Sequence, residues 1–99
     1  MILKHLYELM ILFRGDLPEA EVRKEIDSVK KELSSLGAEN LEEEYWGRKN
    51  LAYKMGSEYS GYYAFIKMSL DGKSVASYKS RLVSSEKVLR RMITRVAGV

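Results

Sequence analysis

Residues 46–53 read WGRKNLAY, and the rest of the chain is arranged around this stretch. It combines two aromatic residues, Trp46 and Tyr53, with Gly47 and the adjacent cations Arg48 and Lys49. An extended backbone of this kind can meet phosphate with charge and nucleobases with ring stacking. The same residues also fit an ordinary bent strand whose aromatic side chains fill the core. Composition alone favours the second interpretation and leaves the first open.

Outward from this stretch, the pattern predicts a long strand from Ala38 to about Met55, with Gly47 as a bulge or bend. A helix from about Pro18 to Leu36 precedes the strand, because its apolar residues recur at spacings of 4, 3, 4 and 3 and form one stripe. We expect Asp16 to cap the start of this helix and Gly37 to end it in the left-handed conformation.

A run of three carboxylates, Glu42 to Glu44, opens the long strand. Successive strand residues point to opposite faces, so these carboxylates cannot converge on one ion, and we expect a solvated edge. The chain has no cysteine and a single histidine, His5, which removes thiolate ligands and leaves no second histidine to share a metal. We therefore expect no transition-metal site.

The remaining elements follow from hydrophobic periodicity and turn residues. A first strand is apolar on both sides, which is typical of a central strand. A glycine-rich and serine-rich turn leads into a third strand, Asp71 caps a second helix, and a last strand carries three arginines. The predicted ranges are Leu6–Phe13 for the first strand, Gly56–Gly61 for the turn, Tyr62–Leu70 for the third strand, Gly72–Val83 for the helix and Val88–Val96 for the last strand.

The order strand, helix, strand, strand, helix, strand is the split βαβ pattern. It predicts an α+β fold in which two helices cover one face of a four-stranded antiparallel sheet. Right-handed crossovers place the first and third strands in the middle. The uncovered face is then apolar and aromatic, and it carries Met10, Leu12, Tyr63 and Phe65.

Ninety-nine residues predict a single domain, 1–99. The net charge is +3, but residues 16–44 are acidic and residues 72–99 are basic. This polarity fits one face suited to an anionic partner, and it also fits the commoner case of a solvated charged face. No apolar run approaches the ~20 residues of a membrane span, and Lys4, His5 and Glu8 interrupt the start of the chain where a signal sequence would be apolar. We expect a cytosolic protein with no membrane contact.

Several motifs occur in an order that resembles the bacterial small-subunit ribosomal protein six family over nearly the whole chain. One departure is Lys54, where the family usually has a proline. The matching motifs are Tyr7-Glu8, Asp16-Leu17, Gly37, Trp46-Gly47-Arg48-Lys49, Leu51-Ala52-Tyr53, Gly61-Tyr62-Tyr63 and Val88-Leu89-Arg90.

The resemblance implies a ferredoxin-like βαββαβ domain that serves as a structural protein of the small ribosomal subunit in the cytoplasm. It implies binding to 16S ribosomal RNA together with small-subunit protein eighteen, and a monomer when isolated. It also implies no enzymatic activity, no catalytic residues and no cofactor. The matched cations Arg48, Lys49 and Arg90, with the adjacent Arg91, are the expected RNA contacts. Trp46 and Tyr53 are expected to shape the strand. The expected contacts with the partner protein are Met10, Leu12, Tyr63 and Phe65.

Other functions fit the same fold. An acylphosphatase needs a phosphate cradle after the first strand, and Arg14 and Gly15 stand there, but Asp16 and Glu19 would repel phosphate. A small regulatory module outside the ribosome would dimerise through its sheet. An RNA-binding module that stacks bases needs aromatic rings on both central strands, whereas the first strand offers only Met10 and Leu12.

Overall fold

A computed structural model describes residues 4–55, 58–81 and 86–96, with side chains for all of these except 52–55, 58 and 81. The elements are β1 (Lys4–Arg14), α1 (Glu19–Ser35), β2 (Glu39–Met55), β3 (Glu58–Asp71), α2 (Gly72–Arg81) and β4 (Val88–Arg95). All neighbouring strands pair antiparallel in the order β2-β3-β1-β4, so the first and third strands are central. The predicted ferredoxin-like α+β fold is confirmed.

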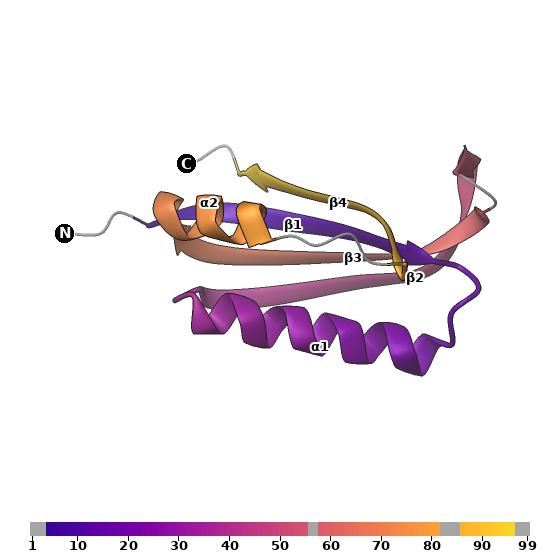
Figure 1. Cartoon of the computed structure of the whole chain (residues 1–99), viewed down its shortest axis with the longest axis horizontal. Coiled ribbons are helices and arrows are strands. Elements are labelled where there is room, and N and C mark those ends of the chain that lie inside the picture. The colour runs from indigo at the N-terminus through magenta and orange to yellow at the C-terminus, as the bar shows by residue number, and fades with distance from the viewer. Residues whose placement is uncertain (1–3, 56–57, 82–85, 97–99) are drawn as a thin grey trace.

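One face of the sheet packs against both helices and forms the core (Figure 1). Alternate residues of β1, Leu9, Ile11 and Phe13, point to this side and are at most 1% exposed. The stripe predicted for the first helix is buried at Val22, Ile26 and Leu33, and α2 adds Val75 and Tyr78. The even-numbered residues of β3 complete the core: Tyr62, Ala64, Ile66, Met68 and Leu70.

Strands β2 and β3 form a hairpin that extends past the rest of the sheet (Figure 1), and the molecule measures 46 × 25 × 22 Å. Pairing continues as far as Met55 with Glu58, so the prediction of a turn over Gly56–Gly61 is wrong at residues 58–61, and residues 56–57 lie outside the description. Gly61 is needed inside β3 for a close approach rather than for a turn. A Cβ atom there would lie 2.5 Å from Cδ1 of Leu12 and 2.8 Å from the carbonyl oxygen of Phe13.

The sequence predicted the end of α1 correctly but not its start. The helix starts later than expected, with Pro18 at the N-cap and no side-chain cap, so the prediction that Asp16 caps it is wrong. The carboxylate of Asp16 instead accepts a hydrogen bond of 2.7 Å from Nη2 of Arg14. At the other end Gly37 has φ +96°, as predicted, and the Ala38 amide donates to the Leu33 carbonyl at 3.0 Å.

Asp71 caps α2, as predicted. Its Oδ1 accepts from the backbone amide of Ser74 at 2.8 Å, and its Oδ2 accepts from the Ser74 hydroxyl at 2.9 Å. These hydrogen bonds favour the charged carboxylate and hold the pKa of Asp71 below its ordinary value of 3.8.

This lowered pKa predicts a pH-dependent contribution to stability. Because the folded-state pKa lies below the unfolded one, the stabilisation is present above about pH 3.8 and is lost as the pH falls through the folded value. We expect Asp71→Asn, which keeps a cap acceptor but removes the charge, to be less stable than the wild type at pH 7. The two proteins should converge near pH 2 in urea unfolding followed by circular dichroism. A stability difference that persists unchanged at pH 2 would contradict the assignment.

Candidate interface for RNA and a protein partner

The sheet face away from the helices, which we call the open face, presents apolar and aromatic side chains. The strand register brings them together: Met10 lies between Phe65 on β3 and Met92 on β4, and Leu12 lies opposite Tyr63. Met92 is 45% exposed, and Met10, Tyr63 and Phe65 are partly exposed. The four residues predicted for this face are therefore all on it.

Trp46 lies on the open face, two residues after Glu44, and a bulge in β2 follows at Gly47. Gly47 has φ +76°, and the register with β3 shifts between Tyr45 and Gly47, which confirms the predicted irregularity. The Trp46 ring lies 4.7 Å from Phe65 and 6.2 Å from Tyr63, measured between ring centroids, and the residue is 50% exposed. The interpretation that Trp46 fills the core is therefore wrong. The side chain of Tyr53 lies outside the described residues.

Leu12 is on the predicted face but offers no surface to a partner. It is only 2% exposed, because its side chain lies over Gly61, where no Cβ occupies the space. The prediction that Leu12 contacts a partner directly is therefore corrected. Leu12 packs beneath the exposed residues of the open face. The sequence signal was present in the glycine, but the pairing of β1 with β3 was needed to show which residue fills the gap.

Arg48 and Lys49 are adjacent in the strand and so face opposite sides, and the bulge decides which of them reaches the open face. Lys49 pairs with Gly61 on the open face, whereas Arg48 pairs with Tyr62, whose side chain is buried on the helix side. The Nε of Arg48 donates to the hydroxyl of Ser60 at 3.3 Å. The two cations of the WGRKNLAY stretch therefore point to opposite faces of β2.

The arginines of β4 separate in the same way. Arg90 pairs with Leu12 and lies on the open face, while Arg91 pairs with Ile11 and lies on the helix side. Burial raises the pKa of Tyr78 in the core, and the positive charge of Arg91 opposes that rise. Of the four predicted RNA contacts, the structure thus places Lys49 and Arg90 at one end of the open face and Arg48 and Arg91 on the other side.

Sequence reasoning missed Arg14, which extends the basic end of the open face. Arg14 pairs with Gly61, the residue that also pairs with Lys49. Its guanidinium donates to Asp16 at 2.7 Å and to the carbonyl of Glu86 at 3.4 Å. The alternation of β1 would have placed Arg14 beside Leu12 if the predicted strand had been extended one residue past Phe13.

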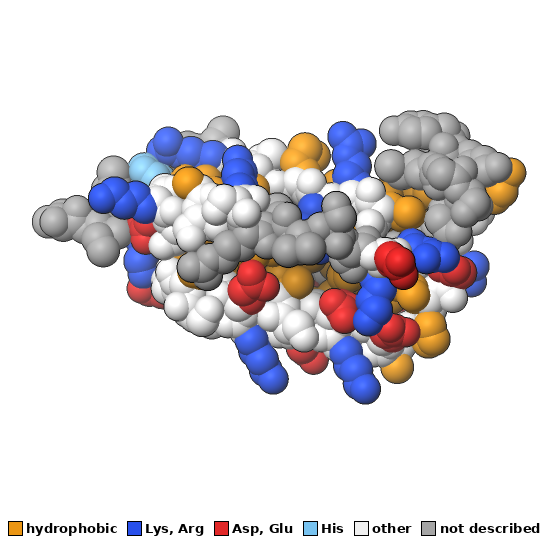
Figure 2. All heavy atoms as spheres, viewed as in Figure 1, with side chains coloured by type: hydrophobic (Ala, Val, Ile, Leu, Met, Phe, Trp, Pro, Cys, Tyr) orange, Lys and Arg blue, Asp and Glu red, His pale blue; other side chains and the backbone are white. Residues whose placement is uncertain are grey.

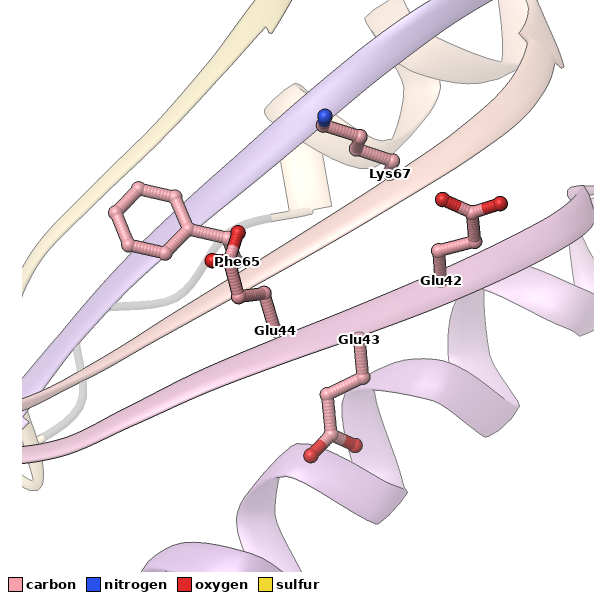
Figure 3. A pocket seen from close by; sticks show the side chains of 5 residues that line it. All are labelled: Glu42, Glu43, Glu44, Phe65 and Lys67. Atoms are coloured by element: carbon pink, nitrogen blue, oxygen red, sulfur yellow. The ribbon is translucent and has the colours of Figure 1, made fainter.

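The other half of the open face is acidic. Glu42 and Glu8 lie on either side of Lys67, and Glu44 lies opposite Phe65. Figure 3 shows Glu42 and Glu44 on the side of Phe65 and Lys67, with Glu43 pointing the opposite way toward α1. The open face therefore runs from an acidic half through an aromatic centre to a basic end. The predicted solvated edge is confirmed, since all three glutamates are exposed.

On the helix side, residues of β2 contact residues of α1. Glu43 forms an ion pair of 2.6 Å with Lys30, and the guanidinium of Arg23 lies 4.4 Å from the centroid of the Tyr45 ring. On the face shown in Figure 2, acidic side chains gather over the half that contains α1, while basic side chains are spread more widely. The helix side therefore holds α1 in place rather than presenting a concentrated basic patch.

Within residues 4–55, 58–81 and 86–96, no group of three or more His, Cys, Asp and Glu side chains could hold a metal ion. In the same part of the chain, no helix is long and apolar enough to cross a membrane.

The sequence model of the family described as ribosomal protein S6 matches residues 6–95. The chain belongs to the ribosomal protein S6 family. This confirms the resemblance inferred from the WGRKNLAY motif and its flanking motifs. Members of the S6 family are proteins of the small ribosomal subunit, so the chain is a ribosomal protein, and its predicted place on the cytoplasmic ribosome is confirmed.

Relatives of known identity agree with the S6 assignment. The chain is 33% identical over 86 residues to the small ribosomal subunit protein bS6 of Dehalococcoides mccartyi strain CBDB1, covering 87% of this chain and 79% of that protein. It is 32% identical over 92 residues to bS6 of Synechococcus sp. strain CC9605, covering 93% and 74%. The crystal structure of 30S ribosomal protein S6 from Thermotoga maritima superposes with a TM-score of 0.82 at 21% identity, covering 95% and 89% of the two chains. That likeness supports the fold.

Proposed function

We propose that this S6 family protein is a non-catalytic structural component that binds 16S ribosomal RNA together with small-subunit protein eighteen. Residues 1–99 act as one domain, which is a monomer when isolated. The observation that carries the proposal is the open face, where exposed aromatic and apolar side chains adjoin a basic end. A face of this composition is suited to a protein partner and to RNA at the same time.

The protein partner covers the aromatic centre of the open face. Met10, Tyr63 and Phe65 supply contact area, Trp46 adds a half-exposed ring, and Leu12 supports them from beneath. Burial of this apolar area against another chain would contribute about 25 cal/mol for each Å² removed from water. Aromatic side chains are also the residues that dominate binding energy at protein interfaces.

The RNA meets the basic end of the open face. Lys49 and Arg90 lie there, Arg14 adds a third cation, and Arg48 and Arg91 remain predicted contacts on the helix side. Neutralised phosphates release counterions, so each contact adds about 0.7–0.9 to the slope of log affinity against log salt concentration. Because so few cations act against fourteen acidic residues, the lone chain should bind RNA weakly. The partner supplies the remaining basic surface.

Sedimentation tests the proposal directly. A tagged copy of the chain, expressed in a bacterium, should migrate with the small ribosomal subunit through a sucrose gradient at moderate salt. The tag fused to an unrelated protein of similar size serves as the control and should remain at the top of the gradient. If the tagged chain also remains at the top while the ribosomal subunits are intact, the proposal is wrong.

A further inference from the structure

We propose that the segment of the partner protein that covers the open face is basic, and that it places a cationic side chain over Trp46 and Phe65, between the carboxylates of Glu42 and Glu44. The inference rests on the proposed function, because it describes how the protein partner is recognised. It goes further by stating the chemistry of the occupant and the place where it binds.

The two carboxylates project on the same side of β2 as the aromatic rings. Glu42 pairs with Lys67 and Glu44 pairs with Phe65, and both glutamates are exposed (Figure 3). Their side chains are two positions apart on one strand, and such neighbours share a face. A cation at Phe65 would therefore have carboxylates within reach along the strand.

The carboxylates of Glu42 and Glu44 also differ from those of their neighbours, because they are not in ion pairs with any of the described residues. In the described part of the chain neither of them forms an ion pair, whereas Glu39 pairs with Lys4 and Glu43 pairs with Lys30. Lys67 is flanked by Glu8 and Glu42 across the neighbouring strands, so one ammonium group stands among three carboxylates, Glu8, Glu42 and Glu44. This half of the face keeps a negative charge that a basic partner would neutralise.

The aromatic rings beside the carboxylates favour the same kind of ligand. Trp46 is 50% exposed and its ring is tilted by 49° against Phe65, so part of this aromatic pair is accessible to a ligand. A cation over the face of tryptophan is attracted by the ring quadrupole, and a guanidinium group can stack on it while it pairs with a carboxylate. The aromatic rings and the carboxylates therefore both favour a cationic side chain.

RNA is disfavoured at this half of the face, because the carboxylates of Glu8, Glu42 and Glu44 would repel phosphate. The cations of the open face that are available to phosphate, Lys49 and Arg90, lie at the opposite end of the strands. The two partners therefore occupy different parts of one surface, the protein on the acidic and aromatic part and the RNA at the basic end.

The test uses the full chain and purified small-subunit protein eighteen, with affinity measured by isothermal titration calorimetry at low and moderate salt. The double variant Glu42→Gln with Glu44→Gln should bind the partner about tenfold or more weakly at low salt, and its affinity should depend less on salt than that of the wild type. Trp46→Leu should also weaken binding. The control, Asp27→Asn with Glu32→Gln, removes the same charge from exposed positions of α1 and should bind within about twofold of the wild type.

Other outcomes separate the inference from the proposed function. If the wild type binds protein eighteen and the Glu42 and Glu44 variant binds equally well, the inference is wrong while the proposed partner stands. If the double variant binds the partner normally but changes RNA binding by the complex, the acidic half is an RNA site and the inference is also wrong. If the wild type does not bind protein eighteen at all, the inference and the proposed partner both fail.

Discussion

Replacing Phe13 by alanine is expected to lower the free energy of unfolding by about 3–5 kcal/mol. Phe13 is 1% exposed and lies in the core between the sheet and the helices. The loss combines the transfer free energy of the ring with the cavity that it leaves. In a domain of about 100 residues each kcal/mol lowers the melting temperature by about 4–8 °C, so the melting temperature should fall by more than ~12 °C. Thermal unfolding followed by circular dichroism measures this change.

The chain provides a matched control, because its two phenylalanines lie on opposite faces of the sheet. Phe65 is partly exposed and packs against Trp46 in a tilted arrangement, and an aromatic pair of this kind contributes about 0.5–1.5 kcal/mol beyond its area. Phe65→Ala should therefore cost less than half as much stability as Phe13→Ala, yet it should weaken binding of the partner protein. Equal loss of stability in the two variants would contradict the distinction between a core face and an open face.

Replacing Lys49 and Arg90 together by alanine is expected to reduce the RNA affinity of the complex with protein eighteen by about tenfold or more, without unfolding the chain. Both residues are exposed, and substitutions at exposed positions usually change stability by about 0.5 kcal/mol or less. Two lost phosphate contacts should also reduce the slope of log affinity against log salt concentration by about 1.4–1.8. Filter binding over a series of salt concentrations measures both effects.

The matched control for this pair replaces Lys24 and Lys31, two exposed lysines of α1, by alanine. It changes the net charge of the chain by the same amount but leaves the open face intact. A similar reduction in the salt slope for both double variants would mean that net charge, rather than the basic end of the open face, sets RNA affinity.

Periodicity predicted the topology because alternation in β1 and β3 separates apolar residues onto two faces. Leu9 and Ile11 pack against the helices while Met10 lies on the open face, as their order in the sequence requires. The striped first helix and the cap at Asp71 were predictable for the same reason, since each depends on residues that are close together in the chain.

The detailed arrangement of the site was less predictable, because it depends on pairing between distant residues. The bulge at Gly47 reverses the alternation after Trp46, so that Lys49 rather than Arg48 lies on the open face, and the glycine alone does not fix which residue is shifted. Leu12 is buried because its side chain lies over Gly61, a contact that depends on the pairing of β1 with β3. The carboxylate of Asp16 was expected at a helix cap but is bound by Arg14 instead.

The most direct test of the account compares RNA binding by the lone chain with RNA binding by its complex with protein eighteen, at physiological salt and on the same fragment of 16S ribosomal RNA. We expect little binding by the lone chain and tight binding by the complex, because the basic end of the open face carries only a few cations and the protein partner supplies the rest. Nanomolar binding of that RNA by the lone chain would contradict it.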